Sequence, residues 1–208
     1  MSKSTTKASF NFYYFSIWLT AIFSAFALGV YAYLGIFSRH LADDYCSVDF
    51  IRTNFFSALW NNYLFVTDRF TNFILIALSE FISPRSFSAL PALMILLCTA
   101  GIAWLLYEAG NFSGQAWAKS TILTLSLLLV FFTLLQAPNR FQILYWRSSM
   151  ATHFAPLVFM PYLASFILRS ISSAAKTPLS YWKYPLGFFI AFIIGGFSEP
   201  PVAVMITL

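Results

Sequence analysis

The sequence predicts an all-α membrane protein, a polytopic helical bundle with about five transmembrane helices. Of its 208 residues, 60% are hydrophobic and only 9% are charged, whereas soluble domains carry about 25% charged residues. The mean hydropathy of +0.75 excludes a disordered chain, because disorder requires low hydrophobicity and a high net charge. The third observation is a series of uncharged stretches long enough to cross a bilayer.

The first predicted span lies between Ala8 and Ser38, where no side chain is charged. This stretch exceeds the roughly 20 apolar residues that a helix needs to cross the hydrocarbon. A cleaved signal peptide is the alternative, because Ala25-Phe26-Ala27 resembles a cleavage site. The apolar run continues to Phe37 and favours an uncleaved anchor. Lys3 and Lys7 precede the span without any acidic residue, which predicts a cytoplasmic N-terminus.

Four further uncharged stretches are candidate spans: 86–107, 120–139, 148–168 and 184–198. A shorter apolar piece, Phe70 to Ser83, is interrupted by Glu80 and reaches only about 22 Å as a helix. We expect it to lie along the membrane interface. If it crosses instead, the sidedness of every later segment is inverted. Only the interfacial arrangement places all lysines on the cytoplasmic side, in agreement with the positive-inside rule.

The chain is therefore expected to form one transmembrane unit over 1–208, with an external loop over 38–83 that carries interfacial helices. We expect a multi-pass membrane protein whose loop over 38–83 lies on the non-cytoplasmic side. Because the sequence stops inside an apolar stretch after Pro200-Pro201, the full protein is expected to continue. The net charge of +5 comes from basic residues dispersed singly, so nucleic acid is not an expected partner.

The first polar cluster follows the first span directly. It contains Arg39, His40, Asp43, Asp44 and Tyr45 at the outer membrane boundary. Paired carboxylates at such a position are candidates for a general base. An ordinary solvated loop is the alternative for an isolated Asp-Asp pair.

A predicted amphipathic helix from Asp49 to Asn62 joins this cluster to a second one, Asp68-Arg69-Phe70. Its polar face is expected to hold Asp49, Arg52, Thr53, Ser57 and Asn61, with Phe50, Ile51, Phe55, Ala58 and Leu59 on the other side. Together with 70–83 it would roof a cavity at the bilayer edge.

Three arginines in this region suit an anionic lipid headgroup. Arg39, Arg52 and Arg69 carry guanidinium groups, which bind phosphate oxygens in pairs. The alternative is that Arg69 pairs with Asp68 while Arg39 only extends toward water from the end of its helix.

Two later clusters complete the candidate substrate-binding set. Tyr145, Trp146, Arg147 and His153 surround the start of a predicted span, where ionisable groups usually face a cavity or a ligand. A simple aromatic belt and a core histidine are the alternatives. Glu199 follows Gly195-Gly196 and precedes a proline, so we expect it to project into a polar pocket rather than toward lipid.

Several common catalytic motifs are absent from the sequence. It contains no phosphate-binding Gly-rich loop with lysine, no His-Glu-x-x-His and no nucleophile elbow. ATP hydrolysis and metalloprotease chemistry are therefore disfavoured. Asp43 and Asp44 could hold a divalent metal, but no further ligand set is evident, and the cofactor stays open.

The arrangement resembles the GT-C superfamily of integral membrane glycosyltransferases, within it the bacterial glucosyltransferase-like and uncharacterised multi-span families with an Asp-Asp-Tyr motif. The resemblance rests on the long first span, on Asp43-Asp44-Tyr45, on the amphipathic helix near Trp60 and Tyr63, and on Asp68-Arg69-Phe70. Phe87 to Leu93 resembles the entry into the second span, and Tyr145-Trp146 with His153-Phe154-Ala155-Pro156 resembles a later external loop. GT-C enzymes have more spans than this chain holds.

The resemblance implies transfer of a sugar from a polyprenyl-phosphate-linked donor on the non-cytoplasmic face. The protein would then be a multi-pass protein of the cell inner (plasma) membrane whose active site faces the periplasmic or external side. Asp43 or Asp44 would then act as the base, and direct attack would invert the anomeric centre. The expected partners are the lipid-linked sugar donor, membrane lipids and a glycan or lipid acceptor. A transporter or flippase for a lipid-linked saccharide is the alternative, which predicts ionisable groups near the bilayer midplane. A purely structural subunit is the third option, but it does not explain the Asp-Asp pair.

Overall fold

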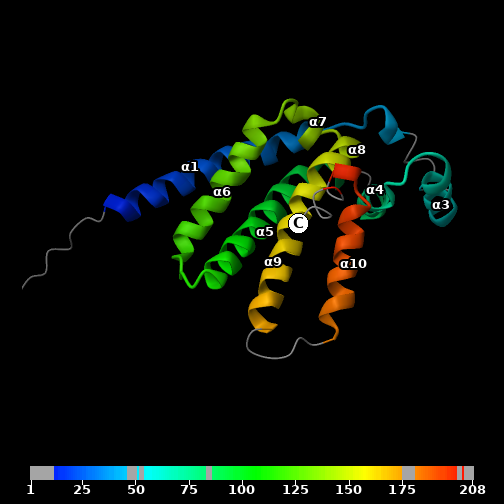
Figure 1. Ribbon diagram of the computed structural model, residues 1–208. Coiled ribbons are helices and arrows are strands. Elements are labelled where there is room, and N and C mark those ends of the chain that lie inside the picture. Colours follow the sequence, from blue (N-terminus) through cyan, green and yellow to red (C-terminus); the bar gives the residue numbers. More distant parts are fainter. Residues whose placement is uncertain are drawn as a thin grey trace, which may run out of the picture.

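The computed structural model describes residues 12–45, 51, 54–82, 86–174, 181–200 and 203. All secondary structure in these ranges is helical, which confirms the predicted all-α class (Figure 1). In chain order the elements are α1 (Phe12–Leu34), the 3-10 turn η1 (Gly35–Phe37), α3 (Phe55–Phe65), α4 (Phe70–Ile82), the 3-10 turn η2 (Ser86–Ser88), α5 (Leu90–Phe112), α6 (Lys119–Gln136), α7 (Arg140–Leu144), α8 (Arg147–Ser149), the π-helical turn η3 (Met150–Phe154), α9 (Ala155–Ala174) and α10 (Lys183–Gly195).

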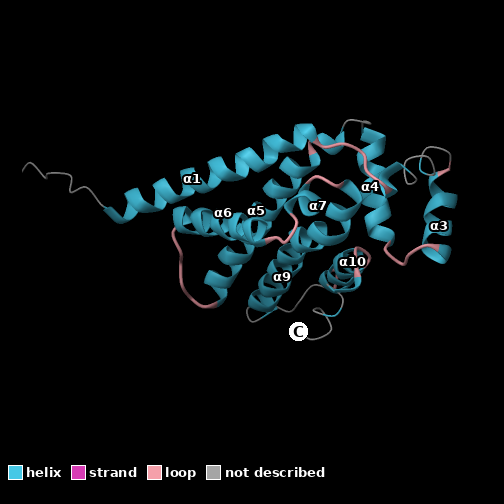
Figure 2. Cartoon of the chain, turned by 90° about the horizontal axis from the view of Figure 1, so that it is seen from above, coloured by secondary structure: helices cyan, strands magenta, loops and turns pink. Residues whose placement is uncertain are grey.

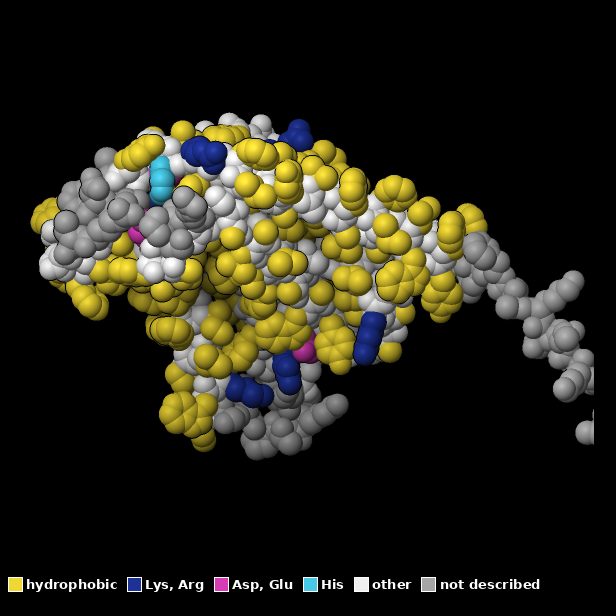
Figure 3. Space-filling view, turned by 180° about the vertical axis from the view of Figure 1, so that it is seen from behind, with side chains coloured by type: hydrophobic (Ala, Val, Ile, Leu, Met, Phe, Trp, Pro, Cys, Tyr) yellow, Lys and Arg dark blue, Asp and Glu magenta, His cyan; other side chains and the backbone are white. Residues whose placement is uncertain are grey.

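Four helical segments are long and apolar enough to cross a membrane: Phe12–Phe37, Leu90–Phe112, Lys119–Gln136 and Arg147–Ser172. The fifth predicted span is the shorter helix α10, whose 13 residues cover about 20 Å. Viewed from behind, the surface is dominated by apolar side chains, with Lys and Arg toward its upper and lower margins (Figure 3). A surface of this kind is suited to lipid.

The bundle is built around α5, which packs against α9, α6 and α1 (Figure 1). A Cβ atom on Gly101 of α5 would lie 2.6 Å from the ring of Tyr162 on α9. Glycine therefore lets these two helices approach closely, as small residues do in membrane bundles. The Tyr162 hydroxyl donates a hydrogen bond of 2.7 Å to the carbonyl of Leu97, which fixes the pair.

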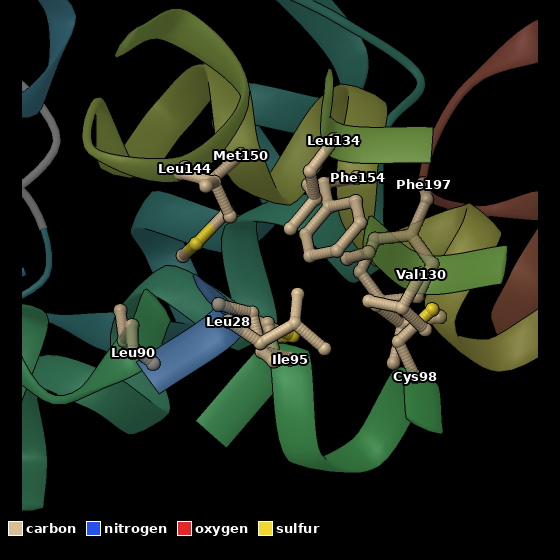
Figure 4. Close-up of a cluster of buried hydrophobic side chains, with 13 residues drawn as sticks. Leu28, Leu90, Ile95, Cys98, Val130, Leu134, Leu144, Met150, Phe154 and Phe197 are labelled. Atoms are coloured by element: carbon tan, nitrogen blue, oxygen red, sulfur yellow. The ribbon is translucent and has the colours of Figure 1, made fainter. Parts of the chain in front are cut away.

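The main hydrophobic cluster joins α1, α5, α6, α7, η3, α9 and the chain after α10 near one end of the bundle (Figure 4). Leu28 of α1, Met94 of α5 and Leu134 of α6 meet there with Phe154 of η3 and Phe197 after α10. Phe154 and Leu134 are completely buried. This packing supplies a rigid base for the segments that follow at the same end.

The segment between α1 and α5 starts and finishes at one end of the bundle, because η1 contacts η2. A Cβ atom on Gly35 would lie only 2.7 Å from the carbonyl oxygen of Ser88. Consequently α4 does not carry the chain to the opposite end. Both α3 and α4 extend beyond the main bundle at this end, and α3 is the peripheral element (Figures 1 and 2).

Within the helix predicted from Asp49 to Asn62, Ile51 is helical, and α3 begins at Phe55 after the non-helical Asn54. The Asn54 side chain accepts a hydrogen bond of 3.2 Å from the Ser57 N–H and caps α3 there, because an Asn at this position satisfies a free helical donor. One prediction about the faces of this helix is wrong. Ala58 was expected on the side opposite Asn61, but the two residues lie on the same face of α3. Asp49, Arg52 and Thr53 lie outside the described residues.

The predicted span 148–168 contains a π-helical turn near its start. The Ala155 N–H bonds to the carbonyl of Met150, five residues earlier. The cause is Pro156, which has no N–H and whose ring would clash with the carbonyl of Thr152 in a regular α-helix. Such turns widen the helix locally, and this one carries Thr152 and His153.

Candidate functional site: a polar cavity at one end of the bundle

A cavity of about 790 Å³ lies between α3, α4 and the segment from α7 to η3. Its volume falls within the range of about 300–1,000 Å³ typical of small-molecule sites. The lining residues are Asp43, Ala58, Asn61, Asn62, Phe65, Val66, Thr67, Arg69, Asn72, Phe73, Ile76, Gln142, Trp146, Ser148, Ser149, Thr152 and His153.

The wall formed by α3 follows a helical face. Ala58, Asn61, Asn62 and Phe65 recur at intervals of three, four and seven residues, which places them on one side of a helix. Trp60 on the opposite side is 63% exposed. The helix thus presents two side-chain amides to the cavity and large apolar groups to its surroundings.

The structure separates the roles of the two adjacent carboxylates. Asp44 is completely buried, and its Oδ1 accepts hydrogen bonds from the Ser148 N–H at 3.1 Å and the Ser148 hydroxyl at 2.5 Å. Its Oδ2 accepts from the Leu41 N–H at 3.1 Å. Trp146, at the N-cap of α8, makes no side-chain capping bond, so Asp44 performs this task from the first loop.

Asp43, by contrast, is exposed and lines the cavity. The residue before it, Ala42, has a φ of 40°, a left-handed conformation that is costly for a residue other than glycine. The hydrogen bond from the Leu41 N–H to Asp44 closes this turn. Asp44 therefore holds the backbone that directs Asp43 toward the cavity.

Arg147 lies beneath the cavity in a buried charge network. Its Nη1 donates to Glu80 Oε2 at 3.0 Å, and its Nε lies 3.7 Å from Asp44 Oδ1. All three side chains are buried. A charged group at such depth requires compensation by a partner, and here one guanidinium joins the first loop to α4.

Arg69 and Glu199 form the second charged contact at this end. Arg69 Nη2 donates to both carboxylate oxygens of Glu199, at 3.1 and 3.0 Å. Backbone hydrogen bonding, followed by the hydrogen bond from Arg69, lowers the pKa of the Glu199 carboxyl below its ordinary value of 4.5. The Arg69 side chain lines the cavity, whereas Glu199 approaches from outside that lining and is largely exposed.

A hydrogen-bonded pair connects two walls of the cavity. Asn72 Nδ2 donates to Thr152 Oγ1 at 2.6 Å, and this hydroxyl donates to the Ser148 carbonyl at 2.9 Å. Asn72 Oδ1, Arg69 Nε and Trp146 Nε1 are buried atoms with no hydrogen-bond partner among the described residues. Buried polar atoms of this kind are rare and call for an explanation. Water or a polar ligand in the cavity would supply the missing partners.

Other predicted substrate contacts lie elsewhere. Arg39 donates to the carbonyls of Ile36 and Ser38 at 3.3 and 2.7 Å at the end of its helix. Tyr45 is exposed and lies next to His40, and Asp68 is exposed next to Arg69 without lining the cavity.

Tyr145 belongs to a separate contact with α1. Its hydroxyl donates to the Tyr31 carbonyl at 3.0 Å. Burial, followed by the neighbouring Tyr31, raises the pKa of Tyr145, and Arg140 opposes this rise. The residue therefore anchors α7 to the bundle rather than facing the cavity.

Sequence reasoning did not identify Glu80, Asn72, Asn62, Gln142 or Ser148 as site residues. Glu80 had a detectable signal, since an acid within an apolar helix requires a partner. The amides and hydroxyls had none, because their roles depend on contacts between distant segments.

The described residues contain no group of three or more His, Cys, Asp or Glu side chains arranged to hold a metal ion. No family model, curated protein or solved structure matches the chain.

Proposed function

We propose that the protein is a membrane glycosyltransferase that uses a polyprenyl-phosphate-linked sugar, with the cavity as its active site. The observation that carries the proposal is the combination of a carboxylate, a guanidinium, an indole and several amides in one chamber at the end of a membrane bundle. A lipid-linked sugar keeps its tail in the bilayer and its headgroup at the interface. A cavity at the end of the bundle would therefore lie at the level of the sugar and its phosphate.

In the proposed reaction, Asp43 acts as the general base. Its carboxylate takes the proton from an acceptor hydroxyl while the hydroxyl oxygen forms a bond to the anomeric carbon. The bond between that carbon and the phosphate oxygen breaks, and the electron pair leaves with the polyprenyl phosphate. Attack opposite the leaving group inverts the configuration. Arg69 stabilises the negative charge that grows on the phosphate, and such contacts contribute about 3–4 kcal/mol in other enzymes.

The remaining lining residues suit a neutral sugar. Asn61, Asn62 and Gln142 carry both donors and acceptors, and Trp146 offers an apolar ring with one N–H group. These side chains would orient the sugar, and positioning of the reacting groups supplies a large part of the rate enhancement.

The proposed orientation places the N-terminus in the cytoplasm and the cavity on the external face of the inner membrane. Lys119 lies at the end of the bundle opposite the cavity, as the antiparallel succession of α5 and α6 requires. Basic residues favour the cytoplasmic side, which supports this orientation.

Transfer can be measured in membranes that contain the protein, with radiolabelled polyprenyl-phosphate monosaccharides as donors. We expect Asp43→Asn to reduce transfer by about 100-fold or more, because general bases typically contribute a factor of about 10² to 10⁴. Because Asp43 is exposed, the variant should keep the thermal stability of the wild type. Equal transfer by both proteins would refute the assignment of the base.

A transporter or flippase for the same lipid is the second candidate, because a polar cavity also suits passage of a headgroup. It predicts that the labelled donor moves between leaflets without any sugar transfer. Apart from Glu108, which is buried near the far end of α5, the acidic groups of the described residues lie at the cavity end of the bundle. This distribution favours the enzyme, since transport requires polar groups along the whole path.

A further inference from the structure

We infer that Glu199 occupies the anion position on Arg69 in the unliganded protein, and that the phosphate of a lipid-linked ligand displaces it. The chemistry of the ligand rests on the proposed function. The inference concerns a step before any sugar transfer, the opening of the phosphate site.

In the pair of Arg69 and Glu199, the guanidinium binds the carboxylate as it would bind a free anion. One nitrogen of Arg69, Nη2, bonds to both oxygens of the Glu199 carboxylate at 3.1 and 3.0 Å. A phosphate presents oxygens with a similar separation and accepts the same charge-assisted bonds. Arg69 Nε is buried without a hydrogen-bond partner in the described part of the chain, so Glu199 does not satisfy every donor of the guanidinium.

The backbone explains why Glu199 reaches Arg69. The Thr71 N–H donates a hydrogen bond of 3.0 Å to the carbonyl of Gly196. A Cβ atom on Gly196 would lie 2.4 Å from the Phe70 ring and 2.4 Å from Thr71 Oγ1. Only glycine lets the end of α10 approach the start of α4 this closely, and Glu199 follows three residues later.

The carboxylate can leave without a large cost. The side chains of Arg69 and Glu199 are 35% and 59% exposed, and exposed ion pairs contribute little to stability because water solvates the separated charges. Glu199 does not line the cavity, so its release does not bury the carboxylate among the side chains of the cavity. Because the pKa of its carboxyl lies below 4.5, Glu199 is anionic at neutral pH. It therefore competes with phosphate for the positive charge of Arg69.

Arg147 cannot exchange its bound carboxylate for a phosphate in the same way. It is buried, and its guanidinium lies between Glu80 and Asp44. Displacement there would separate two buried carboxylates from the guanidinium that compensates their charge. Of these two arginines, Arg69 is the one with an exchangeable anion, and a neutral ligand would not displace Glu199.

The test measures binding alone. The purified protein in phosphatidylcholine nanodiscs is titrated calorimetrically with farnesyl phosphate and, separately, with inorganic phosphate. We expect Glu199→Gln to tighten farnesyl phosphate binding about two- to fivefold, the range set by loss of an exposed competing ion pair. Arg69→Gln should weaken binding about tenfold or more, and adding Glu199→Gln to it should have no further effect.

Asp68→Asn is the matched control, because it removes the same charge one residue from Arg69, where no ion pair joins the two side chains in the described structure. Its effect should be clearly smaller than that of Glu199→Gln. Thermal unfolding of each variant checks that the fold is retained.

Three results would overturn the inference: unchanged or weaker binding in Glu199→Gln, an effect of Glu199→Gln that persists without Arg69, or an equal effect of Asp68→Asn. Equal affinity for inorganic phosphate would overturn the assignment to a lipid ligand. The assay involves no turnover. Displacement without any sugar transfer would therefore refute the proposed enzyme and leave the role of Glu199 intact.

Discussion

At the scale of single residues, adjacent side chains of the same type serve different purposes. Asp43 faces the cavity, whereas Asp44 is buried against the start of α8. The sequence singled out both, because paired carboxylates beside a membrane span are unusual. The sequence could not predict which of the two is buried. The donors that bind Asp44 belong to Ser148, 104 residues away, and no local sequence pattern predicts that contact.

Arg147 provides the first stability prediction. We expect Arg147→Met to destabilise the protein by about 3–5 kcal/mol, because it removes the guanidinium that compensates the buried carboxylates of Asp44 and Glu80. Arg140→Met is the matched control. This exposed arginine bonds to the Tyr31 hydroxyl at 3.2 Å, so its loss should change stability by only about 0.5 kcal/mol.

Denaturation of both variants in the same detergent measures the difference. Asp44→Asn should lower stability in the same direction, since it weakens both the network and the cap of α8. If Arg147→Met unfolds like Arg140→Met, the network does not hold the first loop, and the positioning of Asp43 needs another cause.

At the scale of elements, the long spans were predictable because length and absence of charge decide them. The cap of α3 at Asn54 was not, because the predicted helix from Asp49 to Asn62 treated this position as part of the helix interior. The π-helical turn also escaped prediction, although Pro156 was visible. The proline alone does not predict where Thr152 and His153 will point. Their positions depend on how the surrounding helices pack against the widened turn.

The contact between α10 and α4 gives the element-scale prediction. Gly196→Ala should destabilise the protein by about 1–3 kcal/mol, because its Cβ would overlap the Phe70 ring and Thr71 Oγ1. Gly29→Ala is the control, since no atom lies within 4 Å of its added Cβ. Alanine favours helix there, so this variant should be neutral or slightly more stable.

Thermal unfolding measures the difference in stability between the two glycine variants. The affinity for farnesyl phosphate is a second measurement, which reports on the contact between Glu199 and Arg69. Displacement of the end of α10 should also weaken the contact between Glu199 and Arg69. A Gly196→Ala protein with unchanged stability would mean that α10 and α4 separate without cost.

At the scale of the whole molecule, convergence of distant charged residues on one end of the bundle was the central expectation. The described residues meet it in part: Asp43, Arg69, Trp146 and His153 line one cavity, and Arg147 and Glu199 contact its walls. Arg39, Tyr45 and Tyr145 do not reach it. Their positions at a membrane boundary predicted proximity, but their side chains bond to or pack against the end of α1 and the residues that follow it.

The most direct test of a water-filled, ligand-binding cavity on the external face is cysteine labelling at Ser149. A protein with Cys46→Ser and Cys98→Ala is the background, with Ser149→Cys inside the cavity and Gln115→Cys in the opposite loop. We predict that an impermeant maleimide added outside intact cells labels Ser149→Cys but not Gln115→Cys, and that farnesyl phosphate slows the labelling. Labelling of Gln115→Cys alone, or labelling of Ser149→Cys unaffected by farnesyl phosphate, would contradict the account.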